Sequence, residues 1–225
     1  MKFKDFESVI SSARMSRYLQ AAGHSKKAMT LYRLNLRLSQ EFFTVISCLE
    51  VALRNAIDSH YSTIHGLDWL RDSAQGNGFF NQHNCGKTPS IINMAMTRLN
   101  PYSHQKLIAE MDFGFWRYTF GRHQFHAGGQ TLLVIFPNKP ASTPQIQYNN
   151  TYIFTELEKI NMLRNRLAHH EPICFTNGQA VKDTTYARQH YAQILELFRW
   201  MNINEQALLY GLDHIEEVAD NIDNL

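Results

Sequence analysis

Two arginines, an asparagine and two histidines lie close together in the segment RNRLAHHEP, residues 164–172. Each residue of an α-helix turns by about 100°, so Glu158, Asn165 and His169 fall within about 40° of one another. Arg164 lies about 100° to one side, but its long stem can carry the guanidinium over the same line. The spacing therefore predicts a carboxylate, an amide, an imidazole and a guanidinium on one edge of a helix.

These side-chain types suit a metal-independent cleavage of RNA, in which a ribose 2′-hydroxyl attacks the adjacent phosphorus. Histidine titrates near neutral pH and can take or give the proton. Arginine binds phosphate bidentately and keeps its charge. Asn165 would orient the imidazole or donate to a phosphate oxygen. A single helix of this kind holds too few groups for both a base and an acid, so the reaction would need His170 or a second subunit. The alternative is a helix end whose basic residues only complement the helix dipole.

Helical periodicity predicts the elements that position these residues. Apolar side chains recur at three- and four-residue steps between residues 26 and 61, which indicates one long amphipathic helix. A second stripe runs from about 151 to 169 and stops before Pro172, which biases the preceding residue away from helix. A third helix is expected at about 184–201, and a weaker pattern begins near Asn204.

The region between the first two long helices is less regular. Three glycines in residues 72–89 predict a loop. Short helices are expected at 89–99 and 103–111, opened by a proline and a serine. Residues 121–150 read as an irregular excursion, in which 131–137 (TLLVIFP) would form a short strand.

Composition limits the class of protein. The 225 residues are 44% hydrophobic and 19% charged, which is ordinary for a globular chain. We expect a single all-α domain over residues 1–225, a helical bundle with irregular loop insertions. No apolar run is long enough to span a membrane, and three scattered cysteines indicate reduced thiols. The expectation is a cytoplasmic protein without a signal peptide, a metal site or a cofactor.

Charge is distributed unevenly although the formal net charge is only +2. That small value argues against a protein that coats nucleic acid non-specifically. Residues 205–225 hold six acids and no lysine or arginine. The basic residues between positions 11 and 54 are Arg14, Arg17, Lys26, Lys27, Arg33, Arg37 and Arg54. The two segments would form an anion-binding surface, a tail packed against that surface, or two solvated helix faces.

Two further segments carry weaker signals. Arg54 and Asn55 precede His60, but the imidazole falls about 120° from the arginine around the helix. Glu50 and Arg54 form a favourable i,i+4 pair, so this group would be a polar seam between helices or the lining of an RNA cleft. Residues 112–120 (DFGFWRYTF) would be buried core or an aromatic platform that stacks bases.

The segment RNRLAHHEPI resembles the R-x(4–6)-H motif of the HEPN superfamily, in its RNxxxH form made by Arg164, Asn165 and His169. Three further segments are similar to the Abi-like abortive-infection family within that superfamily. They read LYRLNLRLSQEFFTVISCLEVALRNAIDSHY, MDFGFWRYTFG and YAQILELFRWMN. With the motif they span residues 31 to 202 in order.

This resemblance implies an α-helical, HEPN-like bundle that forms a homodimer. The two RNxxxH helices would meet across a cleft as a composite, metal-independent endoribonuclease site. Arg164 would stabilise the phosphate, His169 would transfer protons and Asn165 would position one or the other. Residues expected to support the site are Glu158, His170, Glu50, Arg54, Asn55 and His60.

The biological role that the resemblance implies is that of a toxin in antiviral defence. Such a protein would cut cellular RNA during abortive infection, and an antitoxin or another regulatory partner would restrain it. The alternative is a catalytically silent module that keeps the fold and binds nucleic acid, nucleotides or a protein partner.

Overall fold

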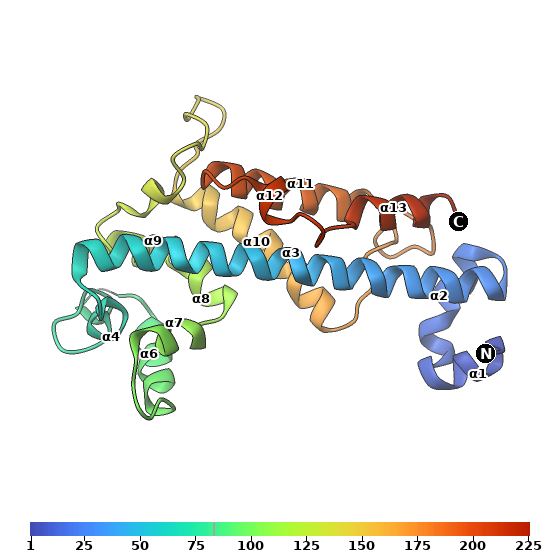
Figure 1. Ribbon diagram of the computed structural model, residues 1–225, viewed down its shortest axis with the longest axis horizontal. Helices are drawn as coiled ribbons and strands as arrows, with labels where there is room; N and C mark the ends of the chain where they lie inside the picture. The colour runs from blue at the N-terminus through green and yellow to red at the C-terminus, as the bar shows by residue number, and fades with distance from the viewer. Residues whose placement is uncertain (83) are drawn as a thin grey trace. The chain divides into compact units, whose positions relative to one another are not determined.

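The chain is described by a computed structural model that covers residues 1–82 and 84–225 (Figure 1). It is 67% helical, and no β-strand occurs among the described residues, which confirms the all-α prediction. Contacts divide it into two compact units. Unit 1 comprises Met1–Ser47, Met162–Glu196 and Glu205–Leu225, and unit 2 comprises Cys48–Asn161 and Leu197–Asn204. The expectation of one domain over 1–225 stays a prediction.

Three long helices confirm the periodicity of the sequence. They are α3 (Ser25–His65), α10 (Asn150–Ala168) and α11 (Thr185–Trp200). Their ends differ from the predicted ones by one to four residues, which is usual for helix boundaries. The apolar stripe of each is buried, with Leu31, Leu163 and Ile194 fully inaccessible to solvent.

Unit 1 is made of helices from both ends of the chain. The shorter ones are α1 (Phe3–Ile10), α2 (Ser12–Ala22), α12 (Glu205–Leu208) and α13 (Ile215–Asp223). Neither α1 nor α2 was expected from periodicity. Ser11 separates these two helices at a φ of 85°, and its hydroxyl accepts a hydrogen bond from the backbone N–H of Arg14. That side-chain cap fixes the beginning of α2.

The core of unit 1 includes a chain of aromatic rings. Tyr32 of α3 meets Phe6 and Tyr18 edge-on, at centroid distances of 5.5 and 5.2 Å. Tyr18 continues to Phe175 at 5.0 Å. Burial raises the pKa of the Tyr18 phenol, so it stays protonated. These contacts hold the N-terminal helices against the segment that follows α10.

The acidic segment 205–225 contains α13, which lies beside α11 in Figure 1. Several of its carboxylates pair with one arginine of α11. Arg188 donates to Asp220 at 2.7 Å and to Asp223 at 3.0 Å, and it also pairs with Glu216. Among the basic residues between positions 11 and 54, Lys27 donates to the carbonyl of Leu225 at the end of this segment. The segment therefore packs within the helical bundle of unit 1 through the buried apolar face of α13 and through the ion pairs with Arg188.

Unit 2 gathers short helices around the later part of α3. They are α4 (Trp69–Ser73), α5 (Phe79–Gln82), α6 (Thr88–Thr97), α7 (His104–Glu110), α8 (Phe113–Tyr118) and α9 (Arg122–Ala127). Helices α4, α6 and α7 lie together in Figure 1. The Oδ1 atom of Asp58 on α3 accepts from Trp69 Nε1 and His104 Nε2, both at 2.7 Å. One carboxylate thus joins α3, α4 and α7.

The predicted short elements of this region were partly right. Helices α6 and α7 confirm the expectations at 89–99 and 103–111, and the Ser103 hydroxyl caps α7 as expected. The strand at 131–137 was wrong, because Leu132–Ile135 forms a 3₁₀ turn whose N–H groups bond locally. The predicted loop at 72–89 contains α5, and its His83 lies outside the described residues.

In the part of the chain that the structure describes, no helix has the length and apolar character needed to cross a membrane.

Candidate active site

The residues of the RNxxxH motif lie at the C-terminal end of α10, which a Schellman turn terminates. His169 follows the last helical residue, and its N–H still bonds to the carbonyl of Asn165 at 3.0 Å. His170 has a φ of 55°, in the left-handed region. The N–H groups of His170 and Glu171 fold back onto carbonyls of the last turn at 2.9 and 2.8 Å. The backbone therefore turns away from the helix axis directly after His169.

The asparagine and the histidine of the motif are exposed. Asn165 and His169 are open to solvent, one helical turn apart, and Arg164 is half-buried beside them in sequence. The predicted helix ran to His169, whereas α10 ends at Ala168, so the imidazole lies at the rim of the helix end. An imidazole in this position is accessible to a large substrate or to a second copy of the chain.

A further arginine reaches the same helix end from α2. Nη1 of Arg14 donates to the backbone carbonyl of His170 at 3.1 Å. The interaction joins residues 156 positions apart. Arg14 is one of the basic residues between positions 11 and 54, but no local pattern linked it to His170. The Arg14 guanidinium is therefore bound to the residue that follows His169 in the chain.

Arg166 has a structural role at the same turn. Its Nη2 donates to the carbonyl of Pro172 at 2.9 Å, and its Nε bonds to Glu171 at 3.2 Å. Its guanidinium also lies 4.7 Å from the centre of the Tyr186 ring. These contacts hold the segment after α10 in place and engage Nε and Nη2 of the guanidinium.

Glu158 forms an ion pair elsewhere on α10. Its Oε1 accepts from Arg117 Nη1 at 2.7 Å, and the Arg117 side chain is 9% exposed while that of Glu158 is 45% exposed. The guanidinium also lies 4.6 Å from the ring centres of Tyr118 and Phe154. Glu158 lies on α10 as predicted, and one of its carboxylate oxygens is bound to Arg117 of α8.

We expect Glu158→Gln to lower stability without reducing any activity at the RNxxxH end. The amide keeps an acceptor for Arg117 but removes the counter-charge of a buried guanidinium. Because Glu158 is almost half exposed, the free energy of unfolding should fall by only about 1 kcal/mol. Thermal denaturation measures this, with exposed Glu110→Gln as the matched control. A large loss of activity without a change in stability would instead place Glu158 in the reaction.

The second RN doublet lies in unit 2, on the later part of α3. Arg54 is half-buried, and its Nε has no hydrogen-bond partner among the described residues. His60 Nε2 lies 2.8 Å from the hydroxyl of Thr131. Burial, and to a smaller extent the nearby His65, lowers the pKa of His60, which favours the neutral ring. Asn55 is exposed and Glu50 is half-buried, and their supporting role stays a prediction.

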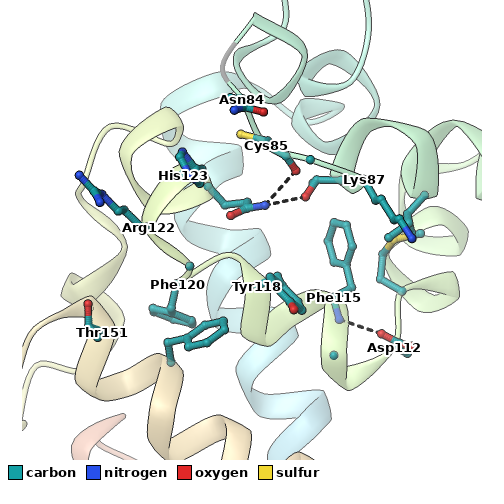
Figure 2. A pocket seen from close by; sticks show the side chains of 18 of the residues that line it. Asn84, Cys85, Lys87, Asp112, Phe115, Tyr118, Phe120, Arg122, His123 and Thr151 are labelled. Atoms are coloured by element: carbon teal, nitrogen blue, oxygen red, sulfur yellow. Dashed lines mark hydrogen bonds between the residues drawn. The ribbon is translucent and has the colours of Figure 1, made fainter.

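Unit 2 also holds a hollow of about 1060 Å³ with an aromatic wall. Figure 2 shows Phe115, Tyr118 and Phe120 along one side and Asn84 and Cys85 on the other. Gln124 is 9% exposed, and its Nε2 donates to the Cys85 carbonyl and to Thr88 Oγ1, both at 3.0 Å. This pair of bonds orients the amide and joins α9 to the beginning of α6.

The aromatic segment 112–120 is mainly core. Phe113, Trp116 and Phe120 are fully buried, whereas Tyr118 is 49% exposed. The Asp112 carboxylate accepts from the N–H of Phe115 at 2.7 Å and begins α8. Of the two alternatives, buried core describes this segment, and Tyr118 alone presents a half-open ring.

Unit 1 contains a smaller cavity next to the RNxxxH end. Its volume is about 270 Å³, and α3 supplies most of its wall. The lining residues are Asn35, Leu36, Ser39, Gln40, Phe43, Leu167 and His170. No local pattern predicted this cavity, because its two sides are more than 120 residues apart in the chain.

Comparison of the chain with models of protein families, with curated proteins and with solved structures finds no match.

Proposed function

We propose that this protein is a metal-independent endoribonuclease of the HEPN type, whose site is completed by a second copy of the chain. The observation that supports this most is the exposure of Asn165 and His169 at the end of α10. A purely structural histidine in a packed bundle would be buried or tied to a neighbouring element. Arg14 supports the proposal further, because it adds positive charge beside the same turn.

The reaction needs one base, one acid and positive charge at the phosphate. His169 of one copy takes the proton from the ribose 2′-hydroxyl, and the 2′-oxygen attacks phosphorus. The bond from phosphorus to the 5′-oxygen breaks, and His169 of the second copy gives a proton to that oxygen. Arg164 balances the charge of the phosphorane, and Asn165 orients the imidazole or the phosphate. The products are a 2′,3′-cyclic phosphate and a 5′-hydroxyl.

His170 is a poorer source of the acid. Its backbone is held on both sides, because its N–H bonds to the Leu167 carbonyl and its own carbonyl accepts from Arg14. It also lines the small cavity between α3 and the end of α10. We therefore assign the second proton transfer to His169 of the other copy.

In the biological role that we propose, cleavage halts growth of an infected cell. The protein would act as a toxin of abortive infection, restrained by an antitoxin or another regulatory partner until a trigger frees it. The support for this role is the sequence resemblance to the Abi-like family.

The direct experiment incubates purified protein with RNA in EDTA and analyses the ends of the products. We expect fragments with 2′,3′-cyclic phosphate and 5′-hydroxyl ends. Binding of RNA with a steep salt dependence but without cleavage would indicate the silent module instead. Absence of both binding and cleavage would contradict the proposal altogether.

Mixing subunits tests the composite site separately. Wild-type and His169→Ala chains are allowed to exchange, and cleavage is measured against the wild-type fraction. If each site needs two intact histidines, an equal mixture keeps about a quarter of the activity, whereas independent subunits keep about half. A linear dependence would contradict the shared site even if RNA is cleaved.

A further inference from the structure

We infer that the small cavity of unit 1 binds one nucleobase of the RNA, next to the bond that is cut. This inference rests on the proposed function and deepens it, because it concerns how the RNA is selected. The cavity meets the RNxxxH end through Leu167 and His170, and His170 directly follows the proposed catalytic histidine.

The wall of the cavity includes the buried side-chain amide of Asn35. Asn35 is only 3% exposed, and its Oδ1 accepts from the N–H of Ile173 at 3.0 Å. Because a backbone N–H can only donate, this bond identifies the oxygen and fixes the orientation of the amide. With the oxygen bound to Ile173, Nδ2 is the other polar atom of this amide, and Asn35 belongs to the cavity lining. Nδ2 is the donor that Asn35 offers to an occupant of the cavity.

A second polar group lies one helical turn further along α3. The Ser39 hydroxyl donates to the carbonyl of Asn35 at 2.9 Å, so its oxygen is left as an acceptor. The wall thus presents a fixed donor and a fixed acceptor about one turn apart. The edges of nucleobases carry both acceptors and donors, so a base can form a hydrogen bond with either group.

The apolar part of the wall suits a flat ring. Phe43 is 37% exposed and Leu36 is 42% exposed, although both belong to a helix with a well-buried stripe. An open phenyl ring is a stacking surface for a base. The volume of about 270 Å³ lies below the roughly 300–1,000 Å³ of pockets for drug-sized ligands, so it suits a single ring system.

The geometry explains why a base rather than a phosphate would occupy the cavity. No arginine or lysine belongs to its lining, whereas Arg14 and the RNxxxH residues lie at the neighbouring helix end. A nucleotide could place its base against Phe43 and its phosphate toward the end of α10. The base in the cavity would then set the position of the scissile bond.

Two variants test the cavity in the full-length protein. Asn35→Asp keeps the oxygen that binds Ile173 but replaces the Nδ2 donor by an acceptor. Phe43→Ala removes the stacking surface, and Val51→Ala, equally exposed on α3 but outside the cavity, is its control. Melting temperatures show whether each variant folds. If Asn35→Asp does not fold, Phe43→Ala alone still tests the cavity.

The first measurement is the sequence around every cut in a random RNA pool. We expect wild type to prefer certain bases at one position beside the cut. Asn35→Asp and Phe43→Ala should each lower the rate at preferred sites by about five- to tenfold and weaken that preference, while Val51→Ala changes neither. Unchanged rates and preferences in both folded variants would overturn the inference and leave the proposed cleavage intact.

The second measurement does not depend on cleavage. Oligonucleotides with 2′-O-methyl groups cannot be cut, and each carries one photoreactive 4-thiouridine or 6-thioguanosine. We expect crosslinks to the cavity residues Phe43 or His170, reduced in Asn35→Asp. Crosslinking here without cleavage by wild type would support the base site and contradict the proposed function. If wild type neither cuts RNA nor crosslinks, both are overturned.

Discussion

Replacing His169 by alanine is expected to abolish RNA cleavage while the protein remains folded. Loss of a general base or acid typically lowers a rate by about 10²–10⁴-fold, and the variant would lose both roles at a shared site. The side chain is exposed, so the free energy of unfolding should change by less than about 0.5 kcal/mol. Cleavage rates in EDTA and thermal denaturation measure the two effects together.

Two other histidines serve as controls for this variant. His123 is exposed in unit 2 and takes no part in the proposed site, so His123→Ala should cleave RNA like wild type. His170→Gly keeps the left-handed turn at the end of α10 and should raise stability, because glycine adopts a positive φ without steric cost. It should lose much less of the cleavage than His169→Ala, because His170 contributes only a part of the cavity wall. If His170→Gly is as inactive as His169→Ala, His170 is the acid.

The same substitution tests the proposed role as a toxin. Expression of the wild-type chain in a bacterial host should inhibit growth, and expression of His169→Ala to the same level should not. Equal growth inhibition by both chains would show that any toxicity arises from something other than RNA cleavage. If His169→Ala unfolds the protein or breaks a dimer while wild type cuts no RNA, the histidine is structural.

Gly78→Ala is expected to cause the largest loss of stability. A Cβ atom at this position would lie 2.1 Å from the carbonyl oxygen of Asp72 and 2.5 Å from the carbonyl group of Ser73. These are backbone atoms at the end of α4, so no side-chain rotation relieves the clash. We expect the free energy of unfolding to fall by about 3 kcal/mol, which lowers the melting temperature by roughly 6–12 °C.

The matched control is Gly114→Ala in α8. The nearest atom to its added Cβ would be Oδ1 of Asp112, at 3.3 Å, the end of a side chain. Alanine also favours helix over glycine by about 1 kcal/mol, so this variant should be close to wild type in stability. Hydrogen exchange should show the Gly78→Ala effect in unit 2. Equal stability of the two variants would mean that the close approach at Gly78 is relieved by a backbone shift.

The long helices could be predicted from sequence because their signal is local. In α3, α10 and α11 the apolar side chains repeat with the helical period over several turns, and such a stripe has few alternative conformations. Helices α4, α5, α8 and α9 have only four to six residues each, too few for a period to show. They are held by tertiary contacts, such as the Asp58 carboxylate that binds Trp69.

In the candidate site, too, local geometry could be predicted from the sequence and contacts between distant residues could not. The amino-acid sequence was enough to predict that Arg164, Asn165 and His169 share the end of one helix, because separations of one to five residues are set by helical geometry. It also determined the all-α class. The ion pair of Glu158 could not be predicted in this way, because its partner Arg117 lies 41 residues away on another helix.

The surroundings of the helix end depend on contacts between residues that are far apart in the chain. Arg14 meets His170 across 156 positions, and Asn35 meets Ile173 across 138. Contacts between such distant residues arise when whole helices pack, and packing depends on the shapes of all the side chains at the interface. No short pattern in the chain encodes them. The motif could therefore be recognised in the sequence, whereas the position of the Arg14 guanidinium and the cavity beside the helix end depend on the fold.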